Sequence, residues 1–162
     1  MTRPIFEYNS NWEIHTLEKN QKEEIILDTS QGSDPSSKDP DSWNGTIPFL
    51  TPKDITGRFT PIYVSAAERY VTKKGVSQSG GIQKANSVML TIRAPVGSVV
   101  INKIPIAANR GFLGFQCGPK LLPEFLYFWF RANKPYLERI ANGSTFDALA
   151  KYDLFELKIG IP

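Results

Sequence analysis

Short hydrophobic blocks separated by turn residues run through the chain and predict a sheet. Each block is rich in β-branched and other apolar side chains, which is typical of strands in a mostly antiparallel sheet. We expect strands at residues 87–93, 97–102 and 111–117, a further one at 47–51 and a last one at 155–161. Two short structured pieces, residues 12–17 and 25–28, precede them.

Prolines and capping residues between these blocks predict several short helices. A single helical turn over residues 52–55 begins with proline, which suits the first turn of a helix. The serine and the glutamate of residues 65–68 have the spacing of a capping box. They predict a helix over residues 66–74, with Gly75 as its stop.

The longest predicted helix lies in the C-terminal third of the chain, over residues 122–133. It begins at Pro123 and carries aromatic side chains on more than one face, so we expect it to be well buried. A break at residues 134–135 separates it from a helix over residues 136–142, which Gly143 ends. The fold class is therefore α+β, a mostly antiparallel twisted sheet with several short helices.

Polar segments suggest where the folded part begins and where its loops lie. Residues 1–11 look like a lead-in, and residues 12–162 then form a single domain, which a chain of 162 residues allows. Residues 31–44 are dense in Gly, Ser, Asp and Pro and predict a loop. Residues 76–81 predict a second, flexible polar loop.

The net charge of +3 hides an uneven distribution of charged residues. Residues 1–57 hold 5 basic and 10 acidic side chains, whereas residues 58–120 hold 9 basic side chains and one acid, Glu68. In residues 121–162 the two signs cancel. A concentrated positive field attracts polyanions, so the pattern favours nucleic-acid binding. The alternative is a solvated surface that the acidic N-terminal part compensates locally.

Cysteine count and hydropathy exclude several classes of protein. A single cysteine, Cys117, rules out an internal disulfide and a cysteine-based zinc site, and a free thiol suits a reducing cytoplasm. The richest apolar run, residues 121–130, contains Pro123 and Glu124 and is too short to cross a bilayer. Residues 1–10 lack the apolar core of a secretory signal. We therefore predict a cytoplasmic protein.

A search for catalytic motifs finds none. A methyltransferase needs a cofactor loop and a polar-Pro-Pro-aromatic motif, and both are missing, as is a phosphate-binding loop. His15 is the only histidine, which excludes a histidine-based metal cluster and favours a structural role. Asp34, Asp39 and Asp41 lack the closing glutamate of a calcium loop. We expect Cys117 to be a small buried hydrophobe rather than a nucleophile. The sequence thus predicts a non-catalytic protein without a metal.

Four short motifs follow one another in the order and at the separations of a known family, and the likeness spans residues 12–162. Each motif is weak alone, but four in order are specific. They are Trp43-Asn44-Gly45-Thr46-Ile47-Pro48-Phe49-Leu50-Thr51-Pro52-Lys53-Asp54-Ile55, Ile92-Arg93-Ala94-Pro95-Val96-Gly97, Asn109-Arg110-Gly111-Phe112 and Gly143-Ser144-Thr145-Phe146. They resemble the W-x-G-x-I-P-W, S-R-A-P-I-G, N-Q-G-F and G-S-T-F motifs of DNA target-recognition domains in type I restriction-modification specificity subunits.

This resemblance implies a function and partners. A specificity subunit of this kind binds double-stranded DNA, and each recognition domain reads one part of a split target. A methyltransferase subunit then uses S-adenosylmethionine to modify adenine, and a motor and nuclease subunit cuts unmodified DNA. The family therefore implies that this chain has no cofactor of its own, because S-adenosylmethionine belongs to the partner. A second recognition domain is a further expected partner.

The sequence departs from the family pattern at two places. Arg110 stands where the family has glutamine in N-Q-G-F. The chain also stops at Pro162, where family members continue into a long spacer helix that docks the methyltransferase. The chain is thus either one recognition domain of a larger subunit or a stand-alone relative.

Basic and hydrogen-bonding side chains between residues 73 and 84 form the first candidate DNA contact. A carboxamide donates and accepts together and suits the edge of adenine, so we expect Gln78 and Gln83 to read bases. Lysines carry only donors and suit phosphates. The candidates are Lys73, Lys74, Gln78, Ser79, Gln83 and Lys84, with Arg58 and Thr60 in a second candidate loop.

Residues of the family motifs have a different expected role, because domains that read different sequences share them. We expect Arg93, Pro95 and Gly97 to form a structural turn, and residues 143–146 to stop a helix and bury Phe146. Phosphate contacts are the alternative for these motifs. On that ground the candidate DNA-binding set also includes Arg93, Arg110, Ser144 and Thr145.

Two further points complete the sequence-based picture. The aromatic residues 127–130 are expected in the core rather than as a stacking platform for bases. A protein-interaction or anti-restriction module with the same fold stays open as an alternative function, and so does a methyltransferase fragment whose catalytic half lies on another chain.

Overall fold

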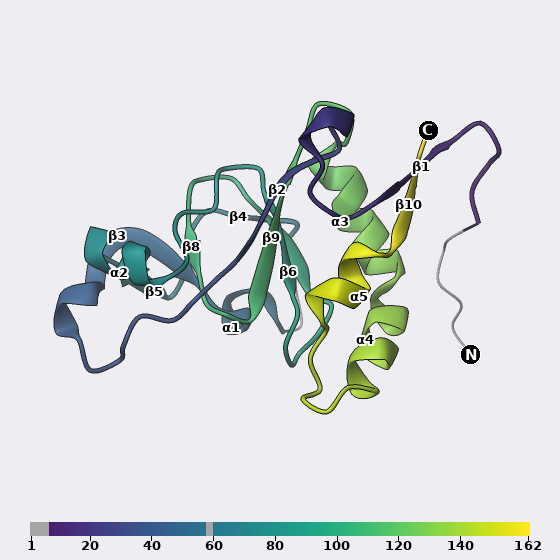
Figure 1. The fold of residues 1–162 in the computed structure, drawn as a ribbon. Coiled ribbons are helices and arrows are strands. Elements are labelled where there is room, and N and C mark those ends of the chain that lie inside the picture. The colour runs from purple at the N-terminus through teal and green to yellow at the C-terminus, as the bar shows by residue number, and fades with distance from the viewer. Residues whose placement is uncertain (1–6, 58–59) are drawn as a thin grey trace.

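A five-stranded sheet forms the centre of the computed structural model, which describes residues 7–57 and 60–162 (Figure 1). In order across the sheet, the strands are β2 (Ile26–Gln31), β9 (Phe112–Cys117), β6 (Val88–Thr91), β7 (Val99–Asn102) and β4 (Tyr63–Val64). The first four pair antiparallel, whereas β4 pairs with β7 in parallel. The predicted antiparallel α+β fold is therefore confirmed.

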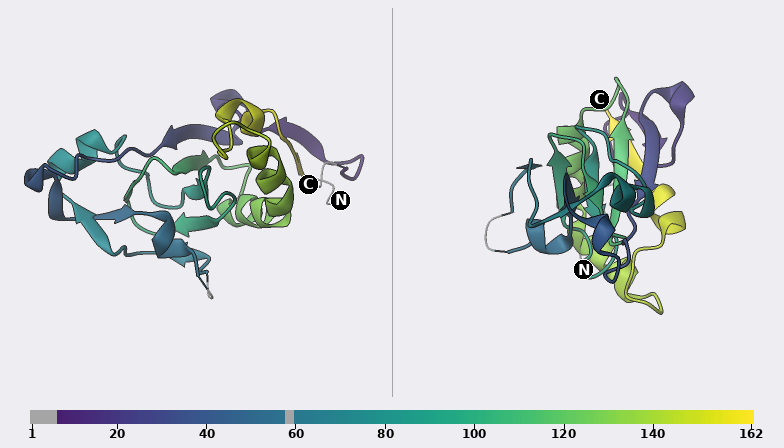
Figure 2. Two further views of the ribbon diagram at one scale, coloured as in Figure 1. Left: turned by 90° about the horizontal axis from the view of Figure 1, so that it is seen from below. Right: turned by 90° about the vertical axis from the view of Figure 1, so that its left-hand side faces the viewer.

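A second, three-stranded sheet lies at one end of the molecule, away from the C-terminus (Figures 1 and 2). Its order is β5 (Arg69–Val71), β3 (Trp43–Leu50) and β8 (Ala107–Ala108). The helix α2 (Lys73–Gln78) and the 3-10 turn η2 (Pro40–Ser42) pack beside it. We call β3, β5, β8, α2 and η2 the small lobe.

Helices cover one face of the main sheet. α3 (Pro123–Ala132) packs on β6 and β7, and the predicted second helix follows it as α4 (Lys134–Asn142). The break lies at Asn133 rather than at residues 134–135, which form the first turn of α4. Beyond them, β10 (Lys158–Ile161) pairs antiparallel with β1 (Glu13–Thr16). The main core lies between α3 and the sheet, where Phe115 and Phe130 are fully buried with their ring centres 5.3 Å apart. Burying each such side chain stabilises the fold by roughly 1.5–3 kcal/mol.

The predicted helix over residues 66–74 is wrong. Residues 69–71 form the strand β5 instead, because Val71 is fully buried in the register of β3, and this pairing outweighs the local capping signal. The helix α2 starts after Thr72, whose hydroxyl oxygen accepts the Gly75 N–H at 3.2 Å. A capping box does occur one helix earlier, at α1 (Pro52–Ile55), where the predicted helical turn is found.

Gly75 lies inside α2, where the sequence predicts a helix stop. A Cβ at this position would overlap the carbonyl oxygen of Ser42, so glycine is required for α2 to pack against η2. The first half of the predicted flexible loop over residues 76–81 is accordingly the end of this helix.

Three further expectations about the C-terminal part need correction. The last strand begins at Lys158 rather than at residue 155, because residues 151–155 form the helix α5 (Lys151–Phe155). Phe146 is 87% exposed rather than buried. Of the aromatic residues 127–130, Phe128 is 54% exposed and the other three are buried. None of the helices among the described residues is long and apolar enough to span a membrane.

Bonds within the segment explain the exposure of Phe146. The Ser144 hydroxyl lies 2.8 Å from the Ala141 carbonyl oxygen and 3.0 Å from that of Ala148, and it accepts the Ala148 N–H at 3.1 Å. These bonds close a tight turn, with Asp147 at a φ of 47°, and leave Phe146 at its tip.

Candidate nucleic-acid interface

The exposed face of α2 in the small lobe presents three of the candidate side chains together. Lys73, Lys74 and Gln78 all lie on this short helix and are all exposed. The helix is held at its start by the Thr72 hydroxyl, which also donates to the Asp41 carbonyl oxygen at 2.6 Å. Three of the candidate DNA contacts between residues 73 and 84 are therefore exposed together, on a helix rather than on a loop.

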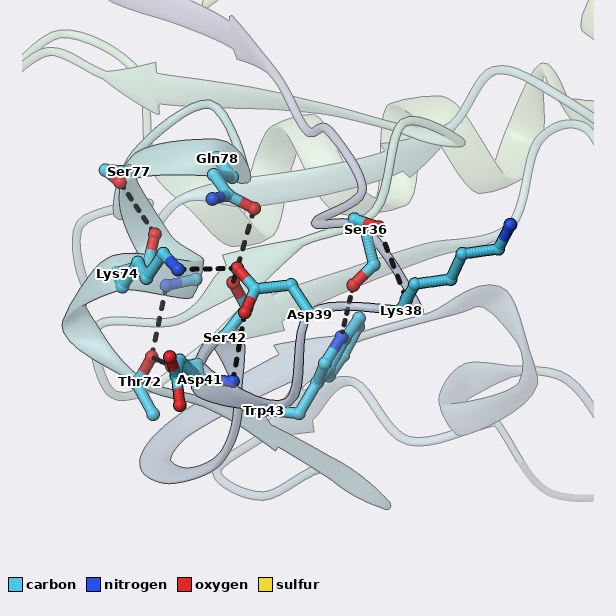
Figure 3. A network of polar contacts seen from close by, with 11 residues as sticks. Ser36, Lys38, Asp39, Asp41, Ser42, Trp43, Thr72, Lys74, Ser77 and Gln78 are labelled. Carbon is cyan, nitrogen blue, oxygen red and sulfur yellow. Dashed lines mark hydrogen bonds and ion pairs between the residues drawn. The ribbon is translucent and has the colours of Figure 1, made fainter.

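A polar network ties this helix to the loop before β3 (Figure 3). The Lys74 ammonium lies 2.8 Å from Asp39 Oδ2, and the Ser42 hydroxyl lies 2.9 Å from the same oxygen. The bond from Lys74, followed by that from Ser42, lowers the pKa of Asp39, and the bond to Asp39 raises the pKa of Lys74. Lys74 is thus partly neutralised, whereas Lys73 has no ion pair with any described residue.

Gln78 is oriented by the same network. Its side-chain amide lies 3.3 Å from the Ser42 hydroxyl oxygen (Figure 3). That hydroxyl has a single proton, and the closer, ionised Asp39 is the stronger acceptor. Gln78 Oε1 therefore receives only a weak share of this proton at 3.3 Å, and the contact leaves the two N–H groups of the amide for a ligand.

Two of the candidate DNA contacts lie inside the protein instead of on its surface. Ser79 is fully buried, and its hydroxyl donates to the Gly75 carbonyl oxygen at 2.5 Å. Gln83 is 5% exposed, and its amide donates to the Ser30 carbonyl oxygen at 3.4 Å. The Ser79 hydroxyl is thus used within the end of α2, and the Gln83 amide joins the turn after α2 to β2. The prediction that Gln83 reads a base is therefore withdrawn, and Lys84 beside it stays exposed.

Acidic residues of the N-terminal part form ion pairs with several of the central basic residues. This is the local charge compensation that the sequence left open as an alternative to nucleic-acid binding. Asp34 accepts the Arg110 backbone N–H at 3.2 Å and lies 3.5 Å from its Nε atom. Lys120 pairs in the same way with Glu24 at 3.5 Å. These exposed pairs reduce the positive field around Arg110 and Lys120 and contribute little stability.

Arg93 lies in the turn between β6 and β7, and Ser144 and Thr145 lie in the segment after α4. The Leu149 N–H donates to the Ile92 carbonyl oxygen at 2.7 Å and so joins the turn to the segment after α4. Arg93 and Thr145 are exposed there, but the Ser144 hydroxyl is used within its own segment. Figure 1 shows α4 and the small lobe at different ends of the molecule, so the twelve candidates do not form one surface.

The turn itself is structural, as expected. The Thr91 hydroxyl donates to the Pro95 carbonyl oxygen at 2.5 Å and accepts the Ser98 N–H at 2.9 Å. Gly97 has a φ of +89°, and a Cβ there would lie 2.9 Å from Cγ of Lys134. The turn therefore needs glycine both for its backbone angle and for the close approach of α4.

Thr60 lines a small polar hollow of about 140 Å³ with Arg131 and Lys134, two basic residues that the sequence did not single out. Their positions on α3 and α4 carried only helix signals, so no local pattern pointed to them. Arg58 lies outside the described residues.

Arg69 is a third basic residue that the candidate set from the sequence does not contain. It lies on β5, is exposed, and places its guanidinium carbon 3.6 Å from the centre of the Trp43 ring. Trp43 is the first residue of β3, so the two come together only through the β3–β5 pairing. A single sequence contains no signal for this contact beyond a tryptophan and a distant arginine.

The side chains weighed for catalysis have structural surroundings. Burial raises the pKa of Cys117 to about 12, so its thiol is protonated at neutral pH. His15 lies between Glu13 at 3.2 Å and Glu23 at 3.0 Å. Over the described part of the chain, no group of three or more His, Cys, Asp or Glu residues is arranged to hold a metal ion.

Comparison with solved structures first places the fold. The structure superposes on the HsdS subunit from Thermoanaerobacter tengcongensis with a TM-score of 0.70 at 19% sequence identity, covering 99% of this chain and 35% of that one. This likeness shows that the chain has the fold of about a third of that subunit.

Sequence comparison then identifies the family. Residues 9–162 match the type I restriction modification DNA specificity domain, and the chain belongs to this family. It is 38% identical over 140 residues to the type I restriction enzyme MjaIX specificity subunit of Methanocaldococcus jannaschii, covering 85% of this chain and 32% of that protein. A putative MjaX specificity subunit of the same organism is 25% identical over 176 residues. The chain thus spans about a third of the length of these relatives.

Proposed function

We propose that this chain is a DNA target-recognition domain that reads part of a double-stranded target through the small lobe. Family membership supports DNA recognition, and the exposed face of α2 supports the location. There Lys73 has no ion pair within the described part of the chain, and the exposed Gln78 contacts Ser42 through its side-chain oxygen at 3.3 Å. Ser79 and Gln83 are excluded from this surface because they are buried.

In this proposal the domain performs no chemistry. It directs a partner methyltransferase and a motor and nuclease subunit to the target, and S-adenosylmethionine binds to the methyltransferase. A second recognition domain would read the other part of a split site. The unreactive, reduced Cys117 fits the cytoplasm in which such a complex would act.

Selection from a randomised duplex library tests the proposal directly. The 162-residue chain is expected to enrich a short preferred sequence and to bind other duplexes with the weak affinity, about 10⁻⁴ to 10⁻⁶ M at physiological salt, of non-specific contacts. Calorimetry is expected to show no binding of S-adenosylmethionine by the chain alone. Tight, stoichiometric binding of that cofactor would support a methyltransferase fragment instead. Equal affinity for all duplexes would favour the protein-interaction or anti-restriction module.

A further inference from the structure

We propose that Arg69 reads a guanine and that Trp43 is the platform that holds it ready. This inference rests on the proposed DNA recognition and names one base contact within it. The guanidinium carbon lies 3.6 Å from the Trp43 ring centre and 6.0 Å from that of Phe49. Such a stack is attractive because the face of the ring is negative, and it also restricts the rotation of the arginine.

The platform is itself fixed on two sides. The Trp43 Nε1–H donates to the Ser36 carbonyl oxygen at 2.9 Å. Its ring also meets the fully buried Phe49 edge to face, at 87° and 5.2 Å between ring centres. The arginine therefore rests on a tryptophan that is held by the core of the small lobe.

An irregularity in the β3–β5 pairing places Trp43 beside Arg69. Both Trp43 and Ile47 have Val71 as their partner in the register, so the residues between them bulge out of the ladder. Asn44 takes a φ of 60°, and a Cβ on Gly45 would overlap the backbone of Val71. The bulge thus folds the tryptophan back across β5.

The free groups of Arg69 match the major-groove edge of guanine. Arg69 is exposed and has no ion pair within residues 7–57 and 60–162, unlike Lys74 and Arg110. With one face stacked, the N–H groups at the edge of the guanidinium stay free and point in a fixed plane. Such a fork bonds guanine O6 and N7 together, and this is the commonest specific contact of arginine with DNA. A phosphate also accepts two bonds from a guanidinium, but it carries no base preference.

Arg69→Lys separates the two contacts, because lysine keeps the charge and loses the planar fork. The dissociation constant is measured for the sequence selected by the wild type and for duplexes in which each preferred guanine is replaced. The wild type is expected to discriminate against replacement of one guanine by about 5- to 150-fold, the range of a bidentate contact. Arg69→Lys is expected to lose this discrimination at that position alone and to bind non-specific duplex as before.

Arg139→Lys is the matched control, because Arg139 is also exposed and also stacks on an aromatic ring, Tyr136, at 5.0 Å, but on α4. It is expected to keep the wild-type preferences. Arg69→Gln is measured as a second variant, and thermal unfolding checks that all variants fold.

Three results would overturn the inference. In the first, both Arg69 variants keep every guanine preference. In the second, they weaken binding to all duplexes equally, as loss of a phosphate contact would. In the third, the selected sequence has no preferred guanine. In each case the wild type still prefers a sequence, so DNA recognition stands. A wild type without any sequence preference would instead overturn the proposed function, and this inference with it.

Discussion

At the scale of single residues, the small lobe positions its polar side chains through shared acceptors. Asp39 accepts from both Lys74 and Ser42, and Ser42 in turn contacts Gln78. The Lys74–Asp39 pair is partly exposed and weak alone, and the two bonds of Ser42 are partly buried. Together they reduce the conformations open to Gln78, which lowers the entropy that a base contact would cost.

Gln78→Ala is expected to change which sequence the domain prefers. Loss of a bidentate contact to adenine costs about 1–3 kcal/mol, so discrimination at one A·T pair should fall by about 5- to 150-fold. The measurement is binding to duplexes substituted at each position of the selected sequence. Ser77→Ala is the control, since Ser77 is exposed on the same helix and bonds only to the Lys74 carbonyl oxygen. Unchanged preferences in Gln78→Ala would remove α2 as the reader.

Cys117 is expected to make the protein less stable at high pH. Its pKa is about 12 in the folded protein, against an ordinary value of 9.0, so above pH 9 the thiol ionises in the unfolded chain but not in the folded one. The stability due to this group is fully present below pH 9 and falls as the pH rises, by about 1.4 kcal/mol at pH 10. Urea unfolding of the wild type and Cys117→Ala at pH 8 and pH 10 measures it. An equal loss in both proteins would contradict the prediction.

At the scale of elements, close backbone packing decides the shape of the small lobe. α2 contacts η2 through Gly75, and β5 joins β3 through Val71. Neither contact is local in the sequence. The face that carries Gln78 therefore depends on a loop before β3 and on a strand that lies some distance along the chain.

Gly75→Ala is expected to destabilise the protein by about 1–3 kcal/mol. Alanine favours a helix by about 1 kcal/mol over glycine, but its Cβ would overlap the Ser42 carbonyl oxygen and force α2 away from η2. Denaturant unfolding measures the difference. Gly143→Ala serves as the control, since the nearest atom to its Cβ would be 3.7 Å away. A stabilised Gly75→Ala protein would show that the two elements separate easily.

At the scale of the whole molecule, the positive charge is less concentrated than the sequence suggests. Lys74, Arg110 and Lys120 have acidic partners from the first 57 residues, whereas Lys73 and Arg69 are left without ion pairs in the described part of the chain. These two residues both lie in the small lobe, at the end of the molecule opposite β1 and β10 (Figure 1).

Lys73→Ala is therefore expected to weaken binding to all duplexes alike and to lower the salt slope of the affinity by about one unit. For Lys74→Ala we expect a smaller change in slope, because Asp39 already neutralises part of its charge. Titrations at several salt concentrations measure both slopes. Lys158→Ala, on β10 at the other end, is expected to match the wild type. A Lys73 variant with an unchanged slope would contradict phosphate contact by α2.

The sequence by itself determined the family, the antiparallel strands β6, β7 and β9, and the helices α1, α3 and α4. These features depend on local patterns, because alternating apolar residues, proline at a helix start and short motifs act within a few residues.

Only the tertiary structure decided which candidate side chains reach the surface together. Pairing with β3 turned a predicted helix into the strand β5, packing buried Gln83, and the bonds of Ser144 exposed Phe146. The stack of Arg69 on Trp43 likewise exists only because a bulge joins two segments. Contacts between distant segments outweigh local preferences of about 1 kcal/mol. No single stretch of sequence contains both partners of such a contact.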